Sequence, residues 1–227
     1  MENFEFLDVG GGTGMWTEKI LAEYPNSKAV VVDFSHEMLE IARKKLLRFG
    51  NRVCFYETDI YKCALDKRFD VVLNTYFLPF IYNTEEMIHH LSNYVAPGGT
   101  LISITENYYS AMFINMLKGG ASNVANLLAS QEGKISDKMP LLKFSKMREL
   151  VNYYCANGLK VMNKVGFPVL TLAGVQENVT DEKNAIWKLL SQDYNLVFGI
   201  EMDEIQAHEN INRGKYLYIS GRMECLE

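Results

Sequence analysis

The sequence predicts an α/β fold in which a parallel sheet carries helices on both faces. Two observations support this prediction. Through the first half of the chain, short apolar runs alternate with longer segments whose apolar residues recur at helical spacing. The turns between them are short, and such repeats of strand and helix build a parallel sheet covered by helices. A chain of 227 residues is long enough to bury the core of one such domain.

The expected strands of the first half are short and end at turn residues. They cover residues 4–9, 28–33, 52–58, 69–75 and 100–105. The expected helices cover residues 13–24, the segment between Ser35 and Gly50, and residues 84–94. Ser35 and Thr84 are suited to cap the start of a helix, and Gly50 is suited to end one.

The second half of the sequence is less regular. Residues 107–142 contain amphipathic pieces rich in Met, Tyr, Asn and Leu, which we interpret as an insertion over the ligand edge of the sheet. Further expected elements are a helix over 143–156, an edge strand within 159–172, a helix-rich stretch over 181–207 and a last strand over 216–223. Because no repeat, low-complexity segment or linker interrupts the chain, the sequence predicts a single domain over residues 1–227.

The most informative segment is a glycine-rich turn between the first strand and the first helix. Gly10, Gly12 and Gly14 alternate shortly after the strand residue Asp8. Glycine lets the backbone take positive φ and lets a ligand lie against bare main chain, and the helix start adds free N–H groups. Asp33 ends the second strand about 20 residues downstream, where an acid can accept hydrogen bonds from ribose hydroxyls. The opening third therefore predicts an adenosine-type site at the carboxyl ends of parallel strands.

Composition and charge narrow the classes of partner. The formal net charge is −5, whereas a nucleic-acid backbone is bound by an excess of cations, so we expect no nucleic-acid partner. No apolar run approaches the roughly 20 residues that span a bilayer, so we expect no membrane partner. The four cysteines show no metal-ligand spacing, so we expect no metal site and reduced thiols, with Cys54 in the core. The sequence begins without a signal peptide, and the expected location is cytoplasmic.

Five motifs, in order, resemble those of the class I S-adenosylmethionine-dependent methyltransferases that act on small molecules. They are DVGGGTG (8–14), VDFSHEML (32–39), TDI (58–60), FDVVLN (69–74) and VAPGGTL (95–101). The resemblance covers residues 4–105 closely and residues 143–223 more loosely. It implies a sheet of seven strands with an antiparallel last strand, a Rossmann-like fold, and S-adenosylmethionine as the cofactor with S-adenosylhomocysteine as the product.

The resemblance also implies the residues that bind this cofactor. They are Asp8, Gly10, Gly12, Gly14, Asp33, Phe34, Met38, Asp59, Ile60 and Asn74. The glycines would let the methionine part of the cofactor lie on the backbone, and Asp8 would hold the loop or reach the ammonium group. Asp33 would take the ribose hydroxyls, while Phe34 and Met38 would pack near the adenine. Asp59 and the Ile60 N–H would contact the adenine, and Asn74 would lie under the methionine part.

Three residues are candidates for the chemistry of the acceptor. Methyl transfer from a sulfonium requires mainly positioning, and a general base is needed only where the acceptor carries a proton at attack. Tyr76 follows the fourth strand and would line the pocket or donate a hydrogen bond. Glu106 ends the fifth strand and would hold a substrate amine, and His208 precedes the last strand within reach of the acceptor. The expected reaction is methyl transfer to N or O of a small molecule.

The sequence departs from the family in one respect. Members commonly carry one or two helices before the first motif, which help to cover the active site, whereas the first strand here is expected from residue 4. We therefore expect that residues 107–142 supply that cover, that a partner such as the second subunit of a homodimer supplies it, or that a native N-terminal segment is missing from the sequence.

Four alternatives remain at this point. A dinucleotide dehydrogenase explains the glycines and Asp33, but not the TDI and PGG motifs. A DNA- or RNA-directed methyltransferase is disfavoured by the charge and by Asn74-Thr75-Tyr76-Phe77, which lacks the two prolines of the Asn-Pro-Pro-Tyr form. A protein of this fold that binds the cofactor without methylating is the third, because fold does not fix function. The last is a protein- or peptide-directed methyltransferase.

Overall fold

The computed structural model describes residues 3–134, 139–167 and 214–225. These residues fall into two compact units. The first comprises Met1–Ile104, Val151–Met162 and Ser220–Glu227, and the second comprises Thr105–Leu150 and Asn163–Ile219. The expected helix-rich stretch over 181–207 and the end of the expected strand at 168–172 lie outside the described residues. A single domain over residues 1–227 stays a prediction.

The described elements alternate between strand and helix up to β5. The strands are β1 (Glu5–Val9), β2 (Lys28–Asp33), β3 (Val53–Glu57), β4 (Phe69–Thr75), β5 (Val95–Glu106), β6 (Glu132–Gly133), β7 (Leu142–Lys143), β8 (Leu159–Phe167) and β9 (Tyr216–Met223). The helices are α1 (Met15–Glu23), α2 (His36–Leu46), α3 (Thr84–Ser92), α4 (Tyr108–Ser130) and α5 (Met147–Ala156). Short 3-10 turns are η1 (Leu47–Arg52), η2 (Ile60–Lys62) and η3 (Leu78–Phe80).

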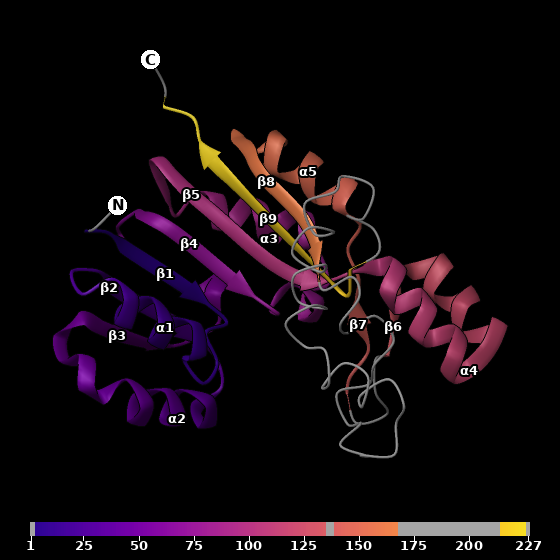
Figure 1. Cartoon of the computed structure of the whole chain (residues 1–227), viewed down its shortest axis with the longest axis horizontal. Coiled ribbons are helices and arrows are strands. Elements are labelled where there is room, and N and C mark those ends of the chain that lie inside the picture. Colours follow the sequence, from indigo (N-terminus) through magenta and orange to yellow (C-terminus); the bar gives the residue numbers. More distant parts are fainter. Residues whose placement is uncertain (1–2, 135–138, 168–213, 226–227) are drawn as a thin grey trace, which may run out of the picture. The chain divides into compact units, whose positions relative to one another are not determined.

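The main sheet has seven described strands in the order β3-β2-β1-β4-β5-β9-β8. The strands from β3 to β5 pair in parallel, and the last strand, β9, runs antiparallel to its neighbours (Figure 1). The predicted α/β class, the mostly parallel seven-stranded sheet and its antiparallel last strand are therefore confirmed. The strand order reverses between β1 and β4, which is the point where open α/β sheets bind ligands at the carboxyl ends of their strands.

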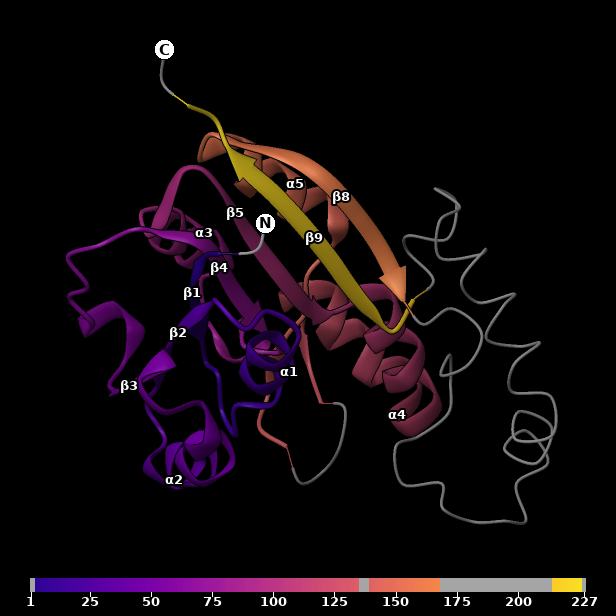
Figure 2. The same cartoon turned by 60° about the vertical axis from the view of Figure 1, so that its left-hand side comes forward.

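Helices cover both faces of the sheet in the first unit. The Thr17 hydroxyl of α1 donates to Asp8 Oδ2 at 2.5 Å, which places α1 on the face that carries Asp8. The Tyr154 hydroxyl of α5 contacts Ser103 Oγ on the face that also carries Asn74 and Val9. Because neighbouring residues of a strand point to opposite faces, α1 and α5 lie on opposite sides of the sheet (Figure 2).

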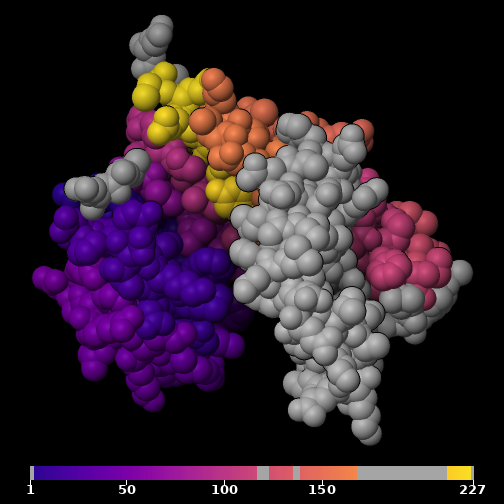
Figure 3. Space-filling model, viewed as in Figure 1, coloured from indigo at the N-terminus to yellow at the C-terminus, as the bar shows by residue number. Residues whose placement is uncertain are grey.

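The core of the first unit explains why these strands form where they do. β1, β2 and β4 are buried on both faces and read as near-continuous apolar runs, as central parallel strands do. Their buried residues belong to the core of the first unit. The surface of the N-terminal part of this unit is indigo to purple in Figure 3. Arg52 completes the end of α1, because its guanidinium donates to the carbonyls of Leu21, Tyr24, Pro25 and Ser27 at 2.7–3.3 Å. These include carbonyls that a helix end leaves without partners.

Several expected boundaries differ from the structure. β5 begins at Val95 rather than at residue 100, because the strand continues through the Pro97-Gly98-Gly99 segment. Asn83 rather than Thr84 caps α3, since its side chain accepts from Glu86 N. Cys54 is exposed and not part of the core, because β3 is an edge strand of the sheet.

The second unit contains the predicted helical insertion after β5. α4 spans 23 residues, and its cap Asn107 accepts from Tyr109 N and donates to Gly214 O at 2.6 Å. Tyr108, Leu127, Leu142 and Phe144 form a small buried cluster within this unit. That residues 107–142 cover a substrate stays a prediction. Within the described residues, no helix combines the length and the apolar character that crossing a membrane requires.

Candidate cofactor site

The glycine-rich loop turns sharply from β1 into α1. Gly10, Gly12 and Gly14 all have positive φ, at 66°, 53° and 71°, a region that glycine enters without steric cost. Gly10 N donates to Val32 O at 2.8 Å, which ties the loop to the end of β2. Gly14 also allows close helix packing, because a Cβ there would lie 2.8 Å from Leu46 Cδ1 of α2. The conformation predicted for this loop from its sequence is therefore present.

An aromatic residue that the sequence did not single out lies against this loop. A Cβ at residue 10 would lie 2.5 Å from Phe77 Cδ2, so the Phe77 ring rests directly on the Gly10 backbone. The preceding residue, Tyr76, has φ 57°, an uncommon conformation for a residue with a side chain. Such backbone positions concentrate at functional sites. Tyr76 turns the chain after β4, and this turn places the Phe77 ring on Gly10.

Asp33 connects the second strand to the loop. Its Oδ2 accepts from Gly12 N at 2.8 Å, and its Oδ1 accepts from Ser35 N at 2.9 Å. Two backbone donors thus fix the orientation of the carboxylate. Each carboxylate oxygen has a further lone pair, so Asp33 can still accept hydrogen bonds from a diol. Ser35 caps α2 as predicted, since its hydroxyl accepts from Met38 N.

Apolar side chains stand exposed beside Asp33. Phe34 is 75% exposed and Met38 is 44% exposed, although both are large and hydrophobic. Asp59 follows β3, and its Oδ1 accepts from Tyr61 N at 3.0 Å, while Ile60 is buried behind it. The strand ends of β2 and β3 therefore present exposed apolar side chains and an acid, which suits a flat heterocycle with an exocyclic amino group.

Asp8 is a buried carboxyl group at the end of β1. It is 1% exposed, and burial is the main reason why its pKa is raised from 3.8 to about 6. The hydrogen bond from Thr17 opposes this shift, and the negative charge of Asp33 adds to it. Thr17 occupies Oδ2, but Oδ1 has no hydrogen-bond partner in the described part of the chain.

Asn74 lies near the end of β4, level with Val9, and points to the face of the sheet opposite to Asp8. It is fully buried, and its Nδ2 donates to Ser103 Oγ at 2.8 Å and to Ile102 O at 3.3 Å. Its Oδ1, like Asp8 Oδ1, is buried and unpaired in the described part of the chain. Buried polar atoms are rarely left without partners in folded proteins. Two unpaired acceptors on neighbouring strands, beside bare glycine backbone, therefore fit a ligand that brings N–H donors.

The three candidates for acceptor chemistry differ in how they are placed. Tyr76 lies at the carboxyl end of β4, and its backbone N donates to Ile104 O at 2.8 Å. Glu106 is half-buried at the end of β5 and belongs to the second compact unit. His208 lies outside the described residues. Catalytic roles for these residues stay predictions.

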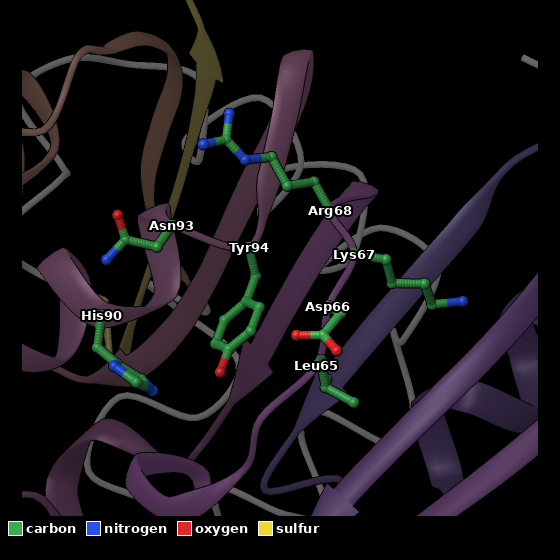
Figure 4. A pocket seen from close by; sticks show the side chains of 7 residues that line it. All are labelled: Leu65, Asp66, Lys67, Arg68, His90, Asn93 and Tyr94. Carbon is green, nitrogen blue, oxygen red and sulfur yellow. The ribbon is translucent and has the colours of Figure 1, made fainter.

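A cavity of about 460 Å³ lies at the opposite end of the sheet, before β4 and β5. Its lining residues are Leu65, Asp66, Lys67, Arg68, His90, Asn93 and Tyr94 (Figure 4). The Tyr94 hydroxyl donates to Cys63 O at 2.7 Å, and His90 Nε2 contacts Ile60 O at 3.0 Å. The charged side chains of Lys67 and Arg68 extend in different directions (Figure 4). This cavity contains none of the predicted site residues, and its charged groups do not converge on a ligand.

Comparison with known proteins supports the predicted class of fold. Residues 6–99 match a family described as a methyltransferase domain. A relative named malonyl-[acyl-carrier protein] O-methyltransferase 2, from Ilyobacter polytropus, is 27% identical over 172 residues, which are 73% of this chain and 66% of the relative. The chain spans about two thirds or less of the curated relatives that it matches.

Solved structures show the same fold. A S-adenosylmethionine-dependent methyltransferase from Mesorhizobium loti superposes with a TM-score of 0.64 at 16% identity, over 97% of this chain and 91% of that one. Phosphoethanolamine N-methyltransferase 2 from Haemonchus contortus, in complex with S-adenosyl-L-methionine, gives a TM-score of 0.63 at 14% identity, over 98% and 49% of the two chains.

The fold, the glycine-rich loop and the family match define the class of protein. Residues 6–99 match a methyltransferase domain, and the fold of the chain is that of class I S-adenosylmethionine-dependent methyltransferases, as its motifs predict. The similar proteins named here are an O-methyltransferase and an N-methyltransferase, so the likeness leaves the acceptor of this chain open.

Proposed function

We propose that this chain binds S-adenosylmethionine across the carboxyl ends of β2, β1 and β4 and transfers its methyl group to a small molecule. The observation that carries the proposal is the pair of buried, unpaired oxygens, Asp8 Oδ1 and Asn74 Oδ1. The ammonium group of a bound amino-acid moiety would supply a donor to Asn74 Oδ1. Asp8 points to the opposite face of the sheet, so a different donor group of the ligand would supply its Oδ1. Gly10 and Gly12 leave the main chain beside them accessible to the ligand.

The residues of this chain would mainly bind, orient and exclude water. The cofactor supplies a methyl group already activated on a sulfonium sulfur. Asp33 would accept from the ribose hydroxyls with the lone pairs that its two backbone contacts leave. Phe34 and Met38 would lose exposed apolar surface to the adenine, which favours binding by the hydrophobic effect. Asp59 would accept from the adenine amino group.

For the acceptor, we propose an oxygen atom and, within that class, the carboxylate of a small acyl group. The relative from Ilyobacter polytropus, whose name includes malonyl-acyl-carrier-protein O-methylation, supports this choice. A carboxylate at neutral pH has no proton to lose at the attacking oxygen, so the transfer would need no general base. An amine is the alternative acceptor. Glu106 would then hold the amine, and Tyr76 or His208 would accept the proton that it loses.

Calorimetric titration with S-adenosylmethionine and S-adenosylhomocysteine tests the cofactor site. We expect both ligands to bind the wild-type chain, and Asp33→Ala to abolish or strongly weaken binding because the ribose loses its acceptor. Asp66→Ala is the matched control, since it removes an exposed acid at the opposite end of the sheet. Absence of binding by the wild-type chain, or equal loss in both variants, would contradict the proposal.

An acceptor panel tests the second half of the proposal. The rate of S-adenosylhomocysteine formation is measured with malonate, with a malonyl thioester of pantetheine and with the same thioester on a carrier protein. Ethanolamine phosphate serves as the amine. Turnover with a carboxylate acceptor would support O-methylation, turnover with the carrier-bound form alone would add a protein partner, and turnover with the amine alone would replace the proposed acceptor atom.

A further inference from the structure

We propose that Ser103 and Tyr154 are positioning residues that hold the Asn74 amide with its oxygen toward the amino-acid part of the cofactor. The inference rests on the proposed function and goes beyond it, because it assigns a role to two residues outside the five motifs. The three side chains form a chain of buried hydrogen bonds. Asn74 Nδ2 donates to Ser103 Oγ at 2.8 Å, and Ser103 Oγ lies 2.7 Å from the Tyr154 hydroxyl.

A contact with the backbone shows which end of the Asn74 side-chain amide faces Ser103 and Tyr154. The same amide atom that contacts Ser103 lies 3.3 Å from Ile102 O. A carbonyl oxygen can only accept a hydrogen bond, so the atom next to it must be the nitrogen, which donates. The amide oxygen of Asn74 is therefore the atom turned away from β5. It is buried and has no hydrogen-bond partner in the described part of the chain.

The position of Asn74 on the sheet indicates which part of the ligand meets that oxygen. Asp33 ends β2 on one side of β1, and Asn74 lies near the end of β4 on the other side, level with Val9. A ligand whose ribose lies at Asp33 crosses the glycine-rich loop at the end of β1 before it reaches β4. The part beyond the ribose, which carries the sulfur and the amino acid, thus lies nearest Asn74.

Tight packing fixes the far end of this chain of bonds. Tyr154 is fully buried on α5, and a Cβ at Gly221 would lie 2.6 Å from its ring atom Cδ1. The ring therefore packs directly on the bare backbone of β9, and its hydroxyl meets Ser103. Since Ser103 Oγ accepts from Asn74, its own proton is available to Tyr154, or Tyr154 donates to it instead. In either case the hydroxyl of Tyr154 limits the rotation of Ser103, which in turn limits the rotation of the amide.

The test uses two ligands that differ in the relevant part. S-adenosylhomocysteine carries the amino acid, whereas 5′-methylthioadenosine has the nucleoside and the thioether without it. Tyr154→Phe removes only the hydroxyl and keeps the ring on Gly221. We expect it to weaken S-adenosylhomocysteine binding about fivefold, the effect of one lost hydrogen bond, and to leave 5′-methylthioadenosine binding unchanged. Ser103→Ala should act in the same direction and at least as strongly.

Tyr94→Phe is the matched control. It removes a buried hydroxyl that also makes a 2.7 Å hydrogen bond, to Cys63 O, at the opposite end of the sheet. We expect this variant to bind both ligands like the wild type, even where its thermal stability falls as much as that of Tyr154→Phe.

The outcomes separate the inference from the proposed function. Wild-type binding with a selective loss for S-adenosylhomocysteine in Tyr154→Phe supports both. Wild-type binding with no change in Tyr154→Phe, or with equal losses for the two ligands, overturns the positioning role and leaves the proposed function intact. A wild-type chain that binds neither ligand overturns the proposed function and the inference together.

Discussion

The carboxyl and amino ends of the central strands differ in how completely their buried polar groups are paired. At the amino ends, Asp70 Oδ2 accepts from Glu5 N at 2.8 Å, and the buried Tyr94 hydroxyl donates to Cys63 O. At the carboxyl ends, Asp8 and Asn74 each keep one buried oxygen without a partner in the described part of the chain. Both ends belong to the same compact unit, so they share one core and one set of strands.

This difference separates a ligand site from a surface hollow. The amino end has a cavity of about 460 Å³, yet the His90 ring and the Tyr94 hydroxyl that line it bond to backbone carbonyls, and Lys67 pairs with Glu5. Unpaired buried acceptors are costly, and a folded chain keeps them where a ligand satisfies them. The unpaired buried oxygens of Asp8 and Asn74 thus indicate the site at the carboxyl end.

The largest expected effect concerns the contact between Gly10 and Phe77. Gly10→Ala should lower the free energy of unfolding by about 3 kcal/mol or more, because positive φ disfavours a Cβ and the Phe77 ring occupies its place. In a double-mutant cycle with Phe77→Ala, the losses in free energy of unfolding of the two single variants should add up to about 1–3 kcal/mol more than the loss measured for the double variant. Denaturant unfolding measures all four proteins.

Gly50→Ala is the control for this cycle. Gly50 also has positive φ, at 55°, but no atom of the described residues lies within 4 Å of the position of its Cβ. Its substitution should combine additively with Phe77→Ala. Coupling of equal size in the two cycles would show that the backbone conformation alone, and not contact with the Phe77 ring, makes alanine unfavourable at residue 10.

The dependence of stability on pH tests whether the pKa of the buried Asp8 side chain is raised. Folding raises the pKa of Asp8 from 3.8 to about 6, so the stability that its protonated form contributes is full below about pH 4 and is lost as the pH rises through 6. Asp8→Asn mimics the protonated form at every pH. The difference in free energy of unfolding between this variant and the wild type should therefore move in favour of the variant by about 3 kcal/mol between pH 4 and pH 7.

The same measurement has an internal reference. The contact between His36 and Glu57 raises the pKa of His36, but both proteins contain this exposed pair, so its effect cancels in the difference. A difference that stays constant from pH 4 to pH 7 would mean that Asp8 ionises as an ordinary surface acid and that its unpaired oxygen meets solvent.

A smaller effect is expected at Gly12, where the space above the loop is open. Among the described residues, a Cβ at Gly12 would have only Gly10 O, at 3.9 Å, near it. Gly12→Ala and Gly50→Ala should therefore each cost about 1–2 kcal/mol of stability through positive φ. Only Gly12→Ala should weaken S-adenosylhomocysteine binding, by about tenfold or more, because the new methyl group enters the space of the ligand. Equal binding by the two variants would place the ligand elsewhere.

Local sequence patterns were sufficient for most of the first unit. The bounds of β2, β4 and β9 agree with the expected ones, because uninterrupted apolar runs end there at turn residues. The start of β5 was missed, since Pro97, Gly98 and Gly99 read locally as a turn and only pairing with β4 reveals the strand. The cap of α3 fell on Asn83 because two adjacent residues were suitable, and local sequence does not choose between them.

The residues of the candidate site likewise include some that the sequence could predict and some that it could not. The glycines, Asp8, Asp33 and Asn74 lie in motifs, so their places at the strand ends could be predicted from spacing. Phe77, Ser103 and Tyr154 could not, because their contacts join residues 29 to 67 positions apart, as in Phe77 on Gly10 or Ser103 between Asn74 and Tyr154. The positive φ of Tyr76, which directs Phe77 toward the loop, could not be predicted either, because glycine and asparagine are the residues that indicate positive φ and Tyr76 is neither.

The smallest effects are expected at the amino ends of the central strands, and they test directly whether these ends differ from the carboxyl ends in ligand binding. Lys67 pairs with Glu5 at 2.9 Å, but both side chains are more than two-fifths exposed. Lys67→Ala and Asp66→Ala should each change the free energy of unfolding by no more than about 0.5 kcal/mol, because exposed ion pairs contribute little. Both should bind S-adenosylhomocysteine like the wild type. A loss of binding in either variant would mean that the cavity at this end takes part in ligand binding, and unpaired buried atoms would then no longer identify the site by themselves.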